Sequence, residues 1–356
     1  MSNRTEAESA RILAAFEAAG ARQVELPILQ SAGSLLDLYG EDIRGRAYTT
    51  RDPLAGELML RPDFTVPVVQ MHLNTGAPEA RYAYAGKVFR VQDWDTDRPS
   101  EYDQVGFEIF GGTDRALADA EVFAVFSRTL AFLPLRVATG DIGILRAAVE
   151  GLTISDRRKA ALLRHLWRPG RFKRLLDRFS GRSAAPSHRA ALVALKDQAM
   201  STAGPLIGLR SEAEIKARLD ALAQDAEEPP LSAAQTDAID AILQLREKLP
   251  AAINALRTVS QDIDGMTPAV DGLAARAEAL TARGVDVANL DFEGAYGRTN
   301  MEYYDGFVFG FYGAAGPETP PVATGGRYDA LTRAMGGDVP AVGGMIRPAL
   351  TAELVQ

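Results

Sequence analysis

The sequence contains no cysteine and only three histidines in 356 residues. Without cysteine there is no disulfide framework, no thiolate nucleophile and no cysteine-based zinc site. The histidines stand far apart, at His72, His165 and His188, which argues against a metal centre. No apolar run is long enough to cross a bilayer, and residues 1–8 lack the basic and then apolar order of a signal peptide. We therefore expect a cytoplasmic protein without disulfides, bound metal or membrane contact.

The short signatures of common enzyme sites are also missing. The sequence has no P-loop, no Gly-x-Gly-x-x-Gly, no His-Glu-x-x-His and no Gly-x-Ser-x-Gly. Its net charge of -8 argues against a nucleic-acid partner, because binding by counterion release requires a basic surface. What remains is an ordinary globular composition, 47% hydrophobic, in a chain long enough for about two domains.

The most informative stretch is 81–112, where the pattern predicts a strand, a long polar loop and a returning strand. Because side chains alternate along a strand, each strand has one apolar face and one more polar face. If the apolar faces point the same way, one patch of the sheet collects Arg90, Gln92, Gln104 and Glu108. A carboxylate can bind an ammonium group and a guanidinium a carboxylate or phosphate, so this patch can hold a small zwitterion. The alternative is a solvated sheet face with weak cross-strand ion pairs.

Elsewhere, hydrophobic periodicity and turn residues predict a mixture of helices and strands. The predicted helices are 5–18, 113–133 and one from Asp141 to about Gly151. The predicted strands are 24–29, interrupted by Pro27, a hairpin at 47–60, and 135–138, 287–292, 301–313 and 340–346.

The character of the sequence changes between residues 146 and 284, which are rich in Ala, Leu, Arg and Asp and have a helical pattern. We interpret 146–284 as a mainly helical insertion into a core formed by 1–145 and 285–356. The polar, Ala-rich stretch 258–280 is typical of a surface helix. A dense basic run indicates either a docking surface or an ordinary solvated helix face. Its members are Arg157, Arg158, Lys159, Arg164, Arg168, Arg171, Lys173, Arg174 and Arg178.

Four separated segments carry a more specific signal. They are Leu60-Arg-Pro-Asp-Phe-Thr, Phe89-Arg-Val-Gln to Gly106-Phe-Glu-Ile-Phe-Gly, Tyr303-Tyr-Asp-Gly-Phe-Val-Phe and Gly325-Gly-Arg-Tyr-Asp. In this order they closely resemble the catalytic domain of class II histidyl-tRNA synthetases, over most of 1–145 and 285–348. The resemblance implies an α+β fold with an antiparallel sheet flanked by helices. It also implies that the first helix and the strand at Pro27 form a dimer interface.

The same resemblance implies a histidine pocket on the sheet face described above. Residues carried over by position are Asp63, Thr65, Gln104, Glu108, Tyr304 and Tyr328, with Arg90 beside the ligand carboxylate. Asp63 is one methylene shorter than the Glu usual at its place. The sequence does not decide whether an effector histidine would use this pocket or a subunit interface.

The pattern departs from the family where ATP chemistry takes place. Gln92 stands where the family has a Glu that places the adenine, and Thr299 and Leu350 stand where it has arginines. The nearest arginines, Arg298 and Arg347, are displaced in sequence. The loop after Gln92 carries carboxylates that would repel a triphosphate, at Asp93, Asp95, Asp97, Glu101 and Asp103. Loss of two electrostatic clamps should lower a synthetase rate by several orders of magnitude, so we expect no catalytic residues.

The sequence also ends after the third motif, where the synthetases continue into an anticodon-binding domain, so none is expected here. An amino-acid pocket with dismantled ATP machinery resembles the regulatory subunits of short-form ATP phosphoribosyltransferases. This resemblance implies a cofactor-free subunit that dimerises and joins a small catalytic subunit in a hetero-octamer. There it would activate the first step of histidine biosynthesis and confer feedback inhibition by histidine. Two alternatives are a truncated synthetase-like ligase that adenylates an amino acid, and a scaffold with a vestigial pocket.

Overall fold

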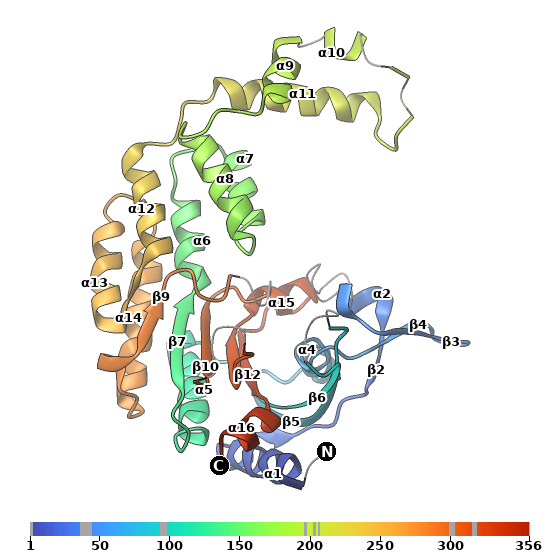
Figure 1. The fold of residues 1–356 in the computed structure, drawn as a ribbon, viewed down its shortest axis with the longest axis vertical. Coiled ribbons are helices and arrows are strands. Elements are labelled where there is room, and N and C mark those ends of the chain that lie inside the picture. Colours follow the sequence, from blue (N-terminus) through green and yellow to red (C-terminus); the bar gives the residue numbers. More distant parts are fainter. Residues whose placement is uncertain are drawn as a thin grey trace.

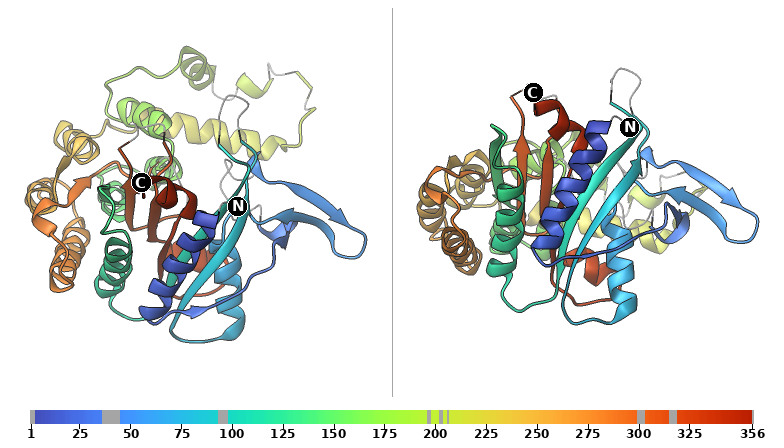
Figure 2. Two further views of the ribbon diagram at one scale, coloured as in Figure 1. Left: turned by 60° about the horizontal axis from the view of Figure 1, so that its bottom comes forward. Right: turned by 90° about the horizontal axis from the view of Figure 1, so that it is seen from below.

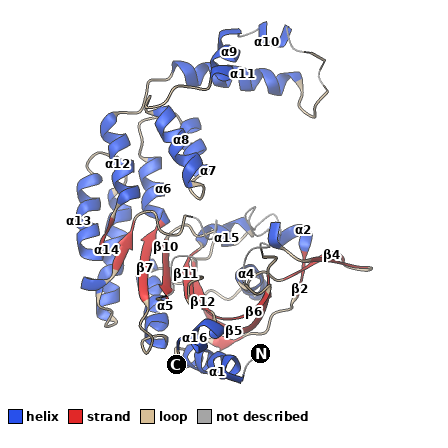
Figure 3. Cartoon of the chain, in the orientation of Figure 1, coloured by secondary structure: helices blue, strands red, loops and turns tan. Residues whose placement is uncertain are grey.

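A nine-stranded sheet with the order β1-β5-β6-β12-β11-β10-β7-β9-β8 forms the centre of the structure (Figures 1 and 3). The computed structural model describes residues 3–35, 45–92, 98–195, 198–201, 204–205, 207–298, 303–314 and 319–355. The strands are β1 (Arg22–Gln23), β5 (Ala80–Phe89), β6 (Glu101–Phe110), β7 (Arg136–Asp141), β8 (Arg246–Lys248), β9 (Asp291–Glu293), β10 (Phe307–Tyr312), β11 (Ala323–Arg327) and β12 (Ala341–Ile346). Neighbours from β5 to β7 in the sheet all pair antiparallel, which confirms the predicted fold class.

One face of the sheet is covered by helices α1 (Asn3–Ala18), α5 (Arg115–Thr129) and α16 (Pro348–Leu354), and α1 crosses β5 and β6 (Figure 2). Phe16 of α1 packs against Phe107 of β6 and Phe126 of α5, with ring centroids 5.5 and 5.2 Å apart. The apolar face predicted from alternation is therefore the face that packs against α1 and α5. Asp114 caps α5 by accepting a hydrogen bond from the Leu117 amide, the usual role of an Asp directly before a helix.

The opposite face carries α4 (Thr65–Thr75), α15 (Asp329–Ala334) and a small projecting sheet. That sheet has the order β2-β4-β3, from β2 (Leu29–Ser31), β3 (Thr49–Asp52) and β4 (Gly56–Leu60), and α2 (Ala32–Leu35) follows β2 (Figure 1). The predicted hairpin at 47–60 is confirmed, and Asp52 closes its turn by accepting from the Leu54 and Ala55 amides. The strand predicted at 24–29, interrupted by Pro27, is wrong, because most of this stretch lies between two strands of different sheets. Pro27 cannot donate to a ladder, and β1 ends before it while β2 begins after it.

Helices dominate the middle of the chain, and Figure 1 shows α9 to α11 at the end of the molecule opposite α1. The helices are α6 (Ile142–Glu150), α7 (Asp156–Arg164), α8 (Pro169–Phe179), α9 (Ser187–Leu195), α10 (Gln198–Ser201), α11 (Glu212–Glu227), α12 (Ala233–Gln244), α13 (Leu249–Val259) and α14 (Thr267–Ala282). The domain division at 146 and 284 stays a prediction. Among the described helices none is both long enough and apolar enough to span a membrane.

Helix α14 corrects one expectation. The stretch 258–280 was expected to be a surface helix, yet α14 packs against α5 and buries Val270, Leu273 and Leu280. Alanine lets two helices approach closely without adding apolar character to the sequence pattern, so the pattern alone does not show the contact.

The strand predicted at 287–292 also differs from expectation, because 287–289 form a 3-10 turn and only 291–293 form a strand.

The basic run on α7 and α8 is partly used inside the protein. Arg158 is buried and its Nε lies 2.8 Å from Asp225 Oδ1 and 3.3 Å from Glu228 Oε2. Lys173 forms ion pairs with Asp177 and Asp240, each at 3.0 Å. Some members, among them Arg164, Arg171 and Arg174, remain exposed. The docking role of this run stays a prediction.

Candidate amino-acid site

Glu108 lies at the centre of a pocket on the sheet face opposite α1. Register pairs Tyr82 with Glu108 and Tyr84 with Gly106, so the predicted polar face of β5 and β6 is shared. Tyr84 Oη donates to Glu108 Oε1 at 2.9 Å, and Tyr328 Oη donates to Glu108 Oε2 at 2.7 Å. Glu108 and Gln104 are each only 1% exposed. The alternative of a solvated sheet face is therefore wrong.

Two glycines make room for this arrangement. A Cβ atom at Gly106 would lie 2.0 Å from the Tyr84 ring, and one at Gly343 would lie 1.5 Å from Glu108 Oε2. Any larger residue would displace the carboxylate or the ring that holds it. Gly106 belongs to the second of the four sequence segments and Gly343 to the predicted strand 340–346, but only the pairing of β6 with β12 reveals what the two glycines accommodate.

The Glu108 pocket collects most of the predicted residues. Its lining is Asp63, Thr65, Tyr84, Gln104, Glu108, Tyr303, Tyr304, Tyr328, Gly343, Gly344 and Met345. Six of the seven predicted site residues are in this set, and Arg90 is the exception. The structure adds Tyr84 and Tyr303, which sequence reasoning did not assign to the site. The enclosed space is only about 10 Å³, so the tyrosines occupy the volume that a ligand would need.

Asp63 and Thr65 form one wall of the pocket, and Arg90 supports it from behind. Asp63 Oδ1 accepts from the Thr65 amide at 3.0 Å, and Thr65 Oγ1 lies 3.2 Å from Tyr303 Oη. Arg90 Nε donates to the Pro62 carbonyl at 2.8 Å, and its Nη2 lies 3.7 Å from Asp63 Oδ2. Arg90 thus stands behind Asp63 and lines the neighbouring cavity instead of the pocket itself.

Burial controls the protonation of the pocket. Loss of hydration raises the pKa of Glu108 from 4.5 to about 8, against the opposing hydrogen bonds from Tyr328 and Tyr84. Burial also raises the pKa of Tyr84, Tyr303 and Tyr328 well above its ordinary value. The tyrosines therefore keep their protons as donors. Gln104 Nε2 is buried and has no hydrogen-bond partner within the described part of the chain, so the pocket holds an unsatisfied donor.

A larger cavity of about 1000 Å³ adjoins the pocket at Tyr304. Five arginines contribute to its lining: Arg46, Arg90, Arg98, Arg136 and Arg347. Burial lowers the pKa of Arg347 to about 10. Gln92 Nε2 donates to the Pro99 carbonyl at 3.3 Å and is not among the lining residues.

The displaced arginine, Arg298, serves another purpose. It is 4% exposed. Its Nε donates to the Leu166 carbonyl at 2.7 Å, and its guanidinium lies 4.8 Å from the centre of the Phe172 ring. The side chain therefore fastens the α7–α8 region and contributes nothing to either cavity wall. Thr299 and the loop carboxylates Asp93, Asp95 and Asp97 lie outside the described residues.

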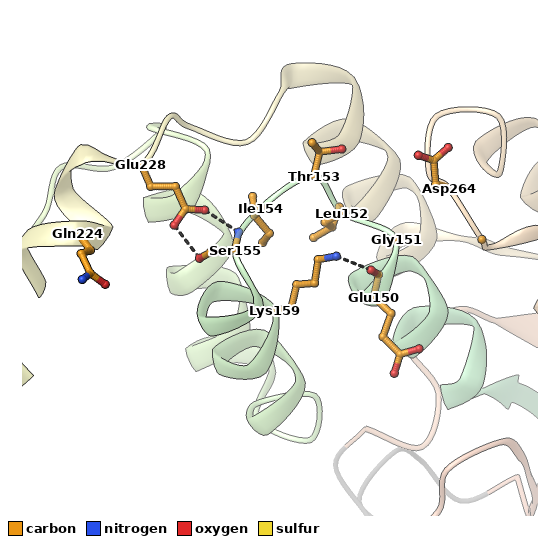
Figure 4. A pocket seen from close by; sticks show the side chains of 11 residues that line it. Glu150, Gly151, Leu152, Thr153, Ile154, Ser155, Lys159, Gln224, Glu228 and Asp264 are labelled. Atoms are coloured by element: carbon orange, nitrogen blue, oxygen red, sulfur yellow. Dashed lines mark hydrogen bonds between the residues drawn. The ribbon is translucent and has the colours of Figure 1, made fainter. Parts of the chain in front are cut away.

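A surface hollow of about 840 Å³ between α6, α7 and the end of α11 is a weaker candidate (Figure 4). Glu228 accepts hydrogen bonds from the Ser155 amide and hydroxyl at 2.7 and 2.6 Å. Lys159 Nζ donates to the Glu150 carbonyl at 2.8 Å, so the Glu228 carboxylate and the Lys159 ammonium each have a partner within the protein. The described residues also contain no cluster of His, Asp or Glu able to hold a metal ion.

The fold and the Glu108 pocket define a protein of the histidyl-tRNA synthetase class. The family model "Histidyl-tRNA synthetase" matches residues 1–228 and 209–348. A solved ATP phosphoribosyltransferase regulatory subunit/histidyl-tRNA synthetase from Bacillus halodurans C superposes with a TM-score of 0.70 at 22% identity, covering 99% of this chain and 79% of that one. Histidyl-tRNA synthetase from Nostoc sp. PCC 7120 superposes with a TM-score of 0.64 at 16% identity, covering 99% and 73%.

Curated relatives narrow the class. The ATP phosphoribosyltransferase regulatory subunit of Allorhizobium ampelinum is 33% identical over 354 residues, covering 92% of each chain. That of Brucella anthropi is 31% identical over 346 residues, covering 91% of this chain and 90% of its own. The chain belongs to the family of ATP phosphoribosyltransferase regulatory subunits. These matches confirm the histidyl-tRNA synthetase resemblance of the four sequence segments. They also confirm the regulatory-subunit family and the non-catalytic class inferred from the altered ATP positions.

Proposed function

We propose that this chain regulates a separate ATP phosphoribosyltransferase catalytic subunit and senses histidine through the Glu108 pocket. The observation that supports the proposal most directly is that a buried acceptor, the Glu108 carboxylate, shares the pocket with a buried donor that has no partner among the described residues, Gln104 Nε2. Glu108 would bind the ligand ammonium and Gln104 Nε2 would donate to a ligand acceptor. Asp63, Thr65, Tyr304 and Tyr328 would complete the pocket, with Arg90 reinforcing the wall at Asp63.

Binding in this pocket requires a conformational change. A space of about 10 Å³ has room for no more than one water, so histidine enters only when the tyrosines move. Tyr303 and Tyr328 are the natural moving parts, because they lie on connections outside the strands. A ligand that prefers the open state shifts the population toward it, and coupling to a partner that prefers one state is reciprocal. This is the physical basis on which histidine would alter the partner's activity.

The finer features of the proposal follow the family. We propose a self-dimer that joins the short-form catalytic subunit in a cytoplasmic hetero-octamer, activates it and confers feedback inhibition by histidine in the first step of histidine biosynthesis. We also propose that 146–284 act as a separate helical domain inserted into the core. The amino-acid ligase alternative is disfavoured by the position of Arg298, which is bonded to Leu166.

The test of the regulatory role is a rate measurement. Phosphoribosyltransferase activity is measured for the short catalytic subunit alone, for this chain alone and for the mixture, with and without histidine. We expect activity above that of the catalytic subunit only in the mixture, and a lower rate when histidine is added. No activation on mixing contradicts the proposal, and histidine-dependent pyrophosphate exchange with ATP by the chain alone supports the ligase alternative.

The test of the pocket is a binding measurement. Isothermal titration of histidine is compared between wild type, Glu108→Gln and the matched control Glu57→Gln, an exposed residue of β4. Loss of the ammonium partner should weaken binding at least about tenfold in Glu108→Gln alone. Equal affinity in all three proteins means that histidine does not use this pocket.

A further inference from the structure

A second polar cavity shares no lining residue with the Glu108 pocket and lies where β7, β10 and β11 meet the surrounding helices. It encloses about 470 Å³ between α5, α6, α14 and α15, and five arginines and four aspartates contribute to its lining. We call it the arginine–aspartate cavity and define it by Arg146, Arg276, Asp305 and Arg327. Phe307 also lines it and packs against Phe123 of α5, whereas the next residue, Val308, lines the cavity beside the Glu108 pocket.

The floor of the arginine–aspartate cavity is a buried ion-pair network. Asp119 lies 3.2 Å from Arg276 Nη1 and 2.7 Å from Arg327 Nη2. Arg276 Nη2 also lies 2.7 Å from Asp141 Oδ2, and Arg327 Nη1 lies 2.8 Å from Asp329 Oδ1. These charges satisfy one another, so the floor is rigid and has little remaining capacity for a ligand.

Above this floor, one hydrogen-bond donor and one hydrogen-bond acceptor lack a partner among the described residues. Arg146 Nε and Asp305 Oδ1 are buried and have no hydrogen-bond partner among the residues that the structure describes. The Asp305 side chain is 8% exposed, and its other oxygen accepts from Arg333 Nη2 at 2.9 Å. Buried polar atoms are nearly always paired, by protein, water or ligand. The cavity therefore presents one cationic donor and one anionic acceptor to whatever fills it.

We propose that the arginine–aspartate cavity is a second binding site for a zwitterionic α-amino acid. The ligand carboxylate would accept from Arg146 and the ligand ammonium would donate to Asp305. The first turns of α5 and α6 also border the cavity, through Ala116 and Gly143, and helix N-termini favour a carboxylate. A zwitterion adds no net charge to a lining in which arginines and aspartates nearly balance.

This site is positioned to influence the Glu108 pocket. Tyr304 lines the pocket and its neighbour Asp305 lines the cavity. Tyr328, which donates to Glu108, stands between Arg327 and Asp329, which both line the cavity. The Asp305 amide donates to the Arg327 carbonyl at 3.0 Å, so the two segments move together. An amino acid bound in the cavity thus biases the tyrosines that open the pocket.

The proposal is tested by saturation-transfer NMR on the full-length chain with a pool of the standard amino acids. Variants are Glu108→Gln by itself and, each combined with Glu108→Gln, Arg146→Gln, Asp305→Asn and the matched control Arg257→Gln on an exposed position of α13. We expect at least one amino acid whose signal survives in Glu108→Gln and in the control, and is lost in both Arg146→Gln and Asp305→Asn. Arg146 Nε has no hydrogen-bond partner among the described residues, so its replacement should leave the fold intact, which circular dichroism checks.

The outcomes separate this inference from the proposed function. If no signal survives in Glu108→Gln, only the Glu108 pocket binds amino acids and the second site is refuted. If a surviving signal is unchanged in both Arg146→Gln and Asp305→Asn, the ligand lies elsewhere and the second site is also refuted. The ligand carboxylate must matter as well. If the amino alcohol that corresponds to the surviving amino acid competes as strongly as the amino acid itself, the assignment of Arg146 is overturned.

Discussion

The protonation of Glu108 gives the sharpest quantitative prediction. An unfolded chain releases the Glu108 proton near pH 4.5, whereas the folded chain holds it until about pH 8. Between these values the folded state binds more protons, so this residue makes the protein less stable as pH rises. One pKa unit corresponds to about 1.36 kcal/mol. The full shift therefore amounts to a penalty on the order of 4 to 5 kcal/mol at about pH 8 and to almost none near pH 4.5.

Glu108→Gln removes this titration while keeping the shape of the side chain. The amide changes the hydrogen bonds from Tyr84 and Tyr328, which adds an offset that does not depend on pH. Relative to wild type, the free energy of unfolding of the variant should therefore increase by several kcal/mol from about pH 5 to about pH 8. Urea unfolding followed by circular dichroism measures it, with Glu57→Gln as the exposed control. A difference that stays constant across this range refutes the raised pKa.

Three further outcomes follow from the same geometry. Gly343→Ala forces a Cβ to within 1.5 Å of Glu108 Oε2, so it should lose about 1 to 3 kcal/mol in chemical unfolding, whereas Gly170→Ala, with open space around it, should not. Arg276→Met leaves Asp119 with one fewer cation and should cost about 3 to 5 kcal/mol, seen as a lower thermal midpoint; an unchanged midpoint would contradict the network. Histidine affinity should rise about tenfold per pH unit between about pH 6 and pH 8, because the ammonium requires ionised Glu108, and calorimetry showing no proton release on binding would exclude this.

Local patterns predicted much of the fold and of the pocket. Alternation along a strand is a property of the backbone, so the sequence alone placed Gln104 and Glu108 on one face. The caps at Asp114 and Asp141 and the hairpin closed by Asp52 were equally predictable, because each depends on contacts within three residues. The prediction of a strand around Pro27 was wrong, because the chain passes there from the nine-stranded sheet to the three-stranded sheet.

What the sequence could not show depends on contacts between distant segments. Tyr303 lines the pocket in contact with Thr65, which is 238 residues away in the sequence, and no local pattern relates the two residues. Gly343 matters because β12 lies beside β6. The ion pairs of Arg276 with Asp119 and Asp141 likewise join residues more than 130 positions apart, which is why α14 resembled a surface helix.

The closed pocket and the raised pKa of Glu108 together define how this site would respond to its ligand. With a pKa of about 8, only about one tenth of the molecules carry an ionised Glu108 near pH 7. An apparent dissociation constant equals the intrinsic one divided by the competent fraction, so ionisation alone weakens binding about tenfold before the tyrosines move. A synthetase active site gains nothing from this loss, because a catalyst benefits from a site preorganised for its reaction. A regulator does gain, because a stable empty state gives the ligand an equilibrium to shift.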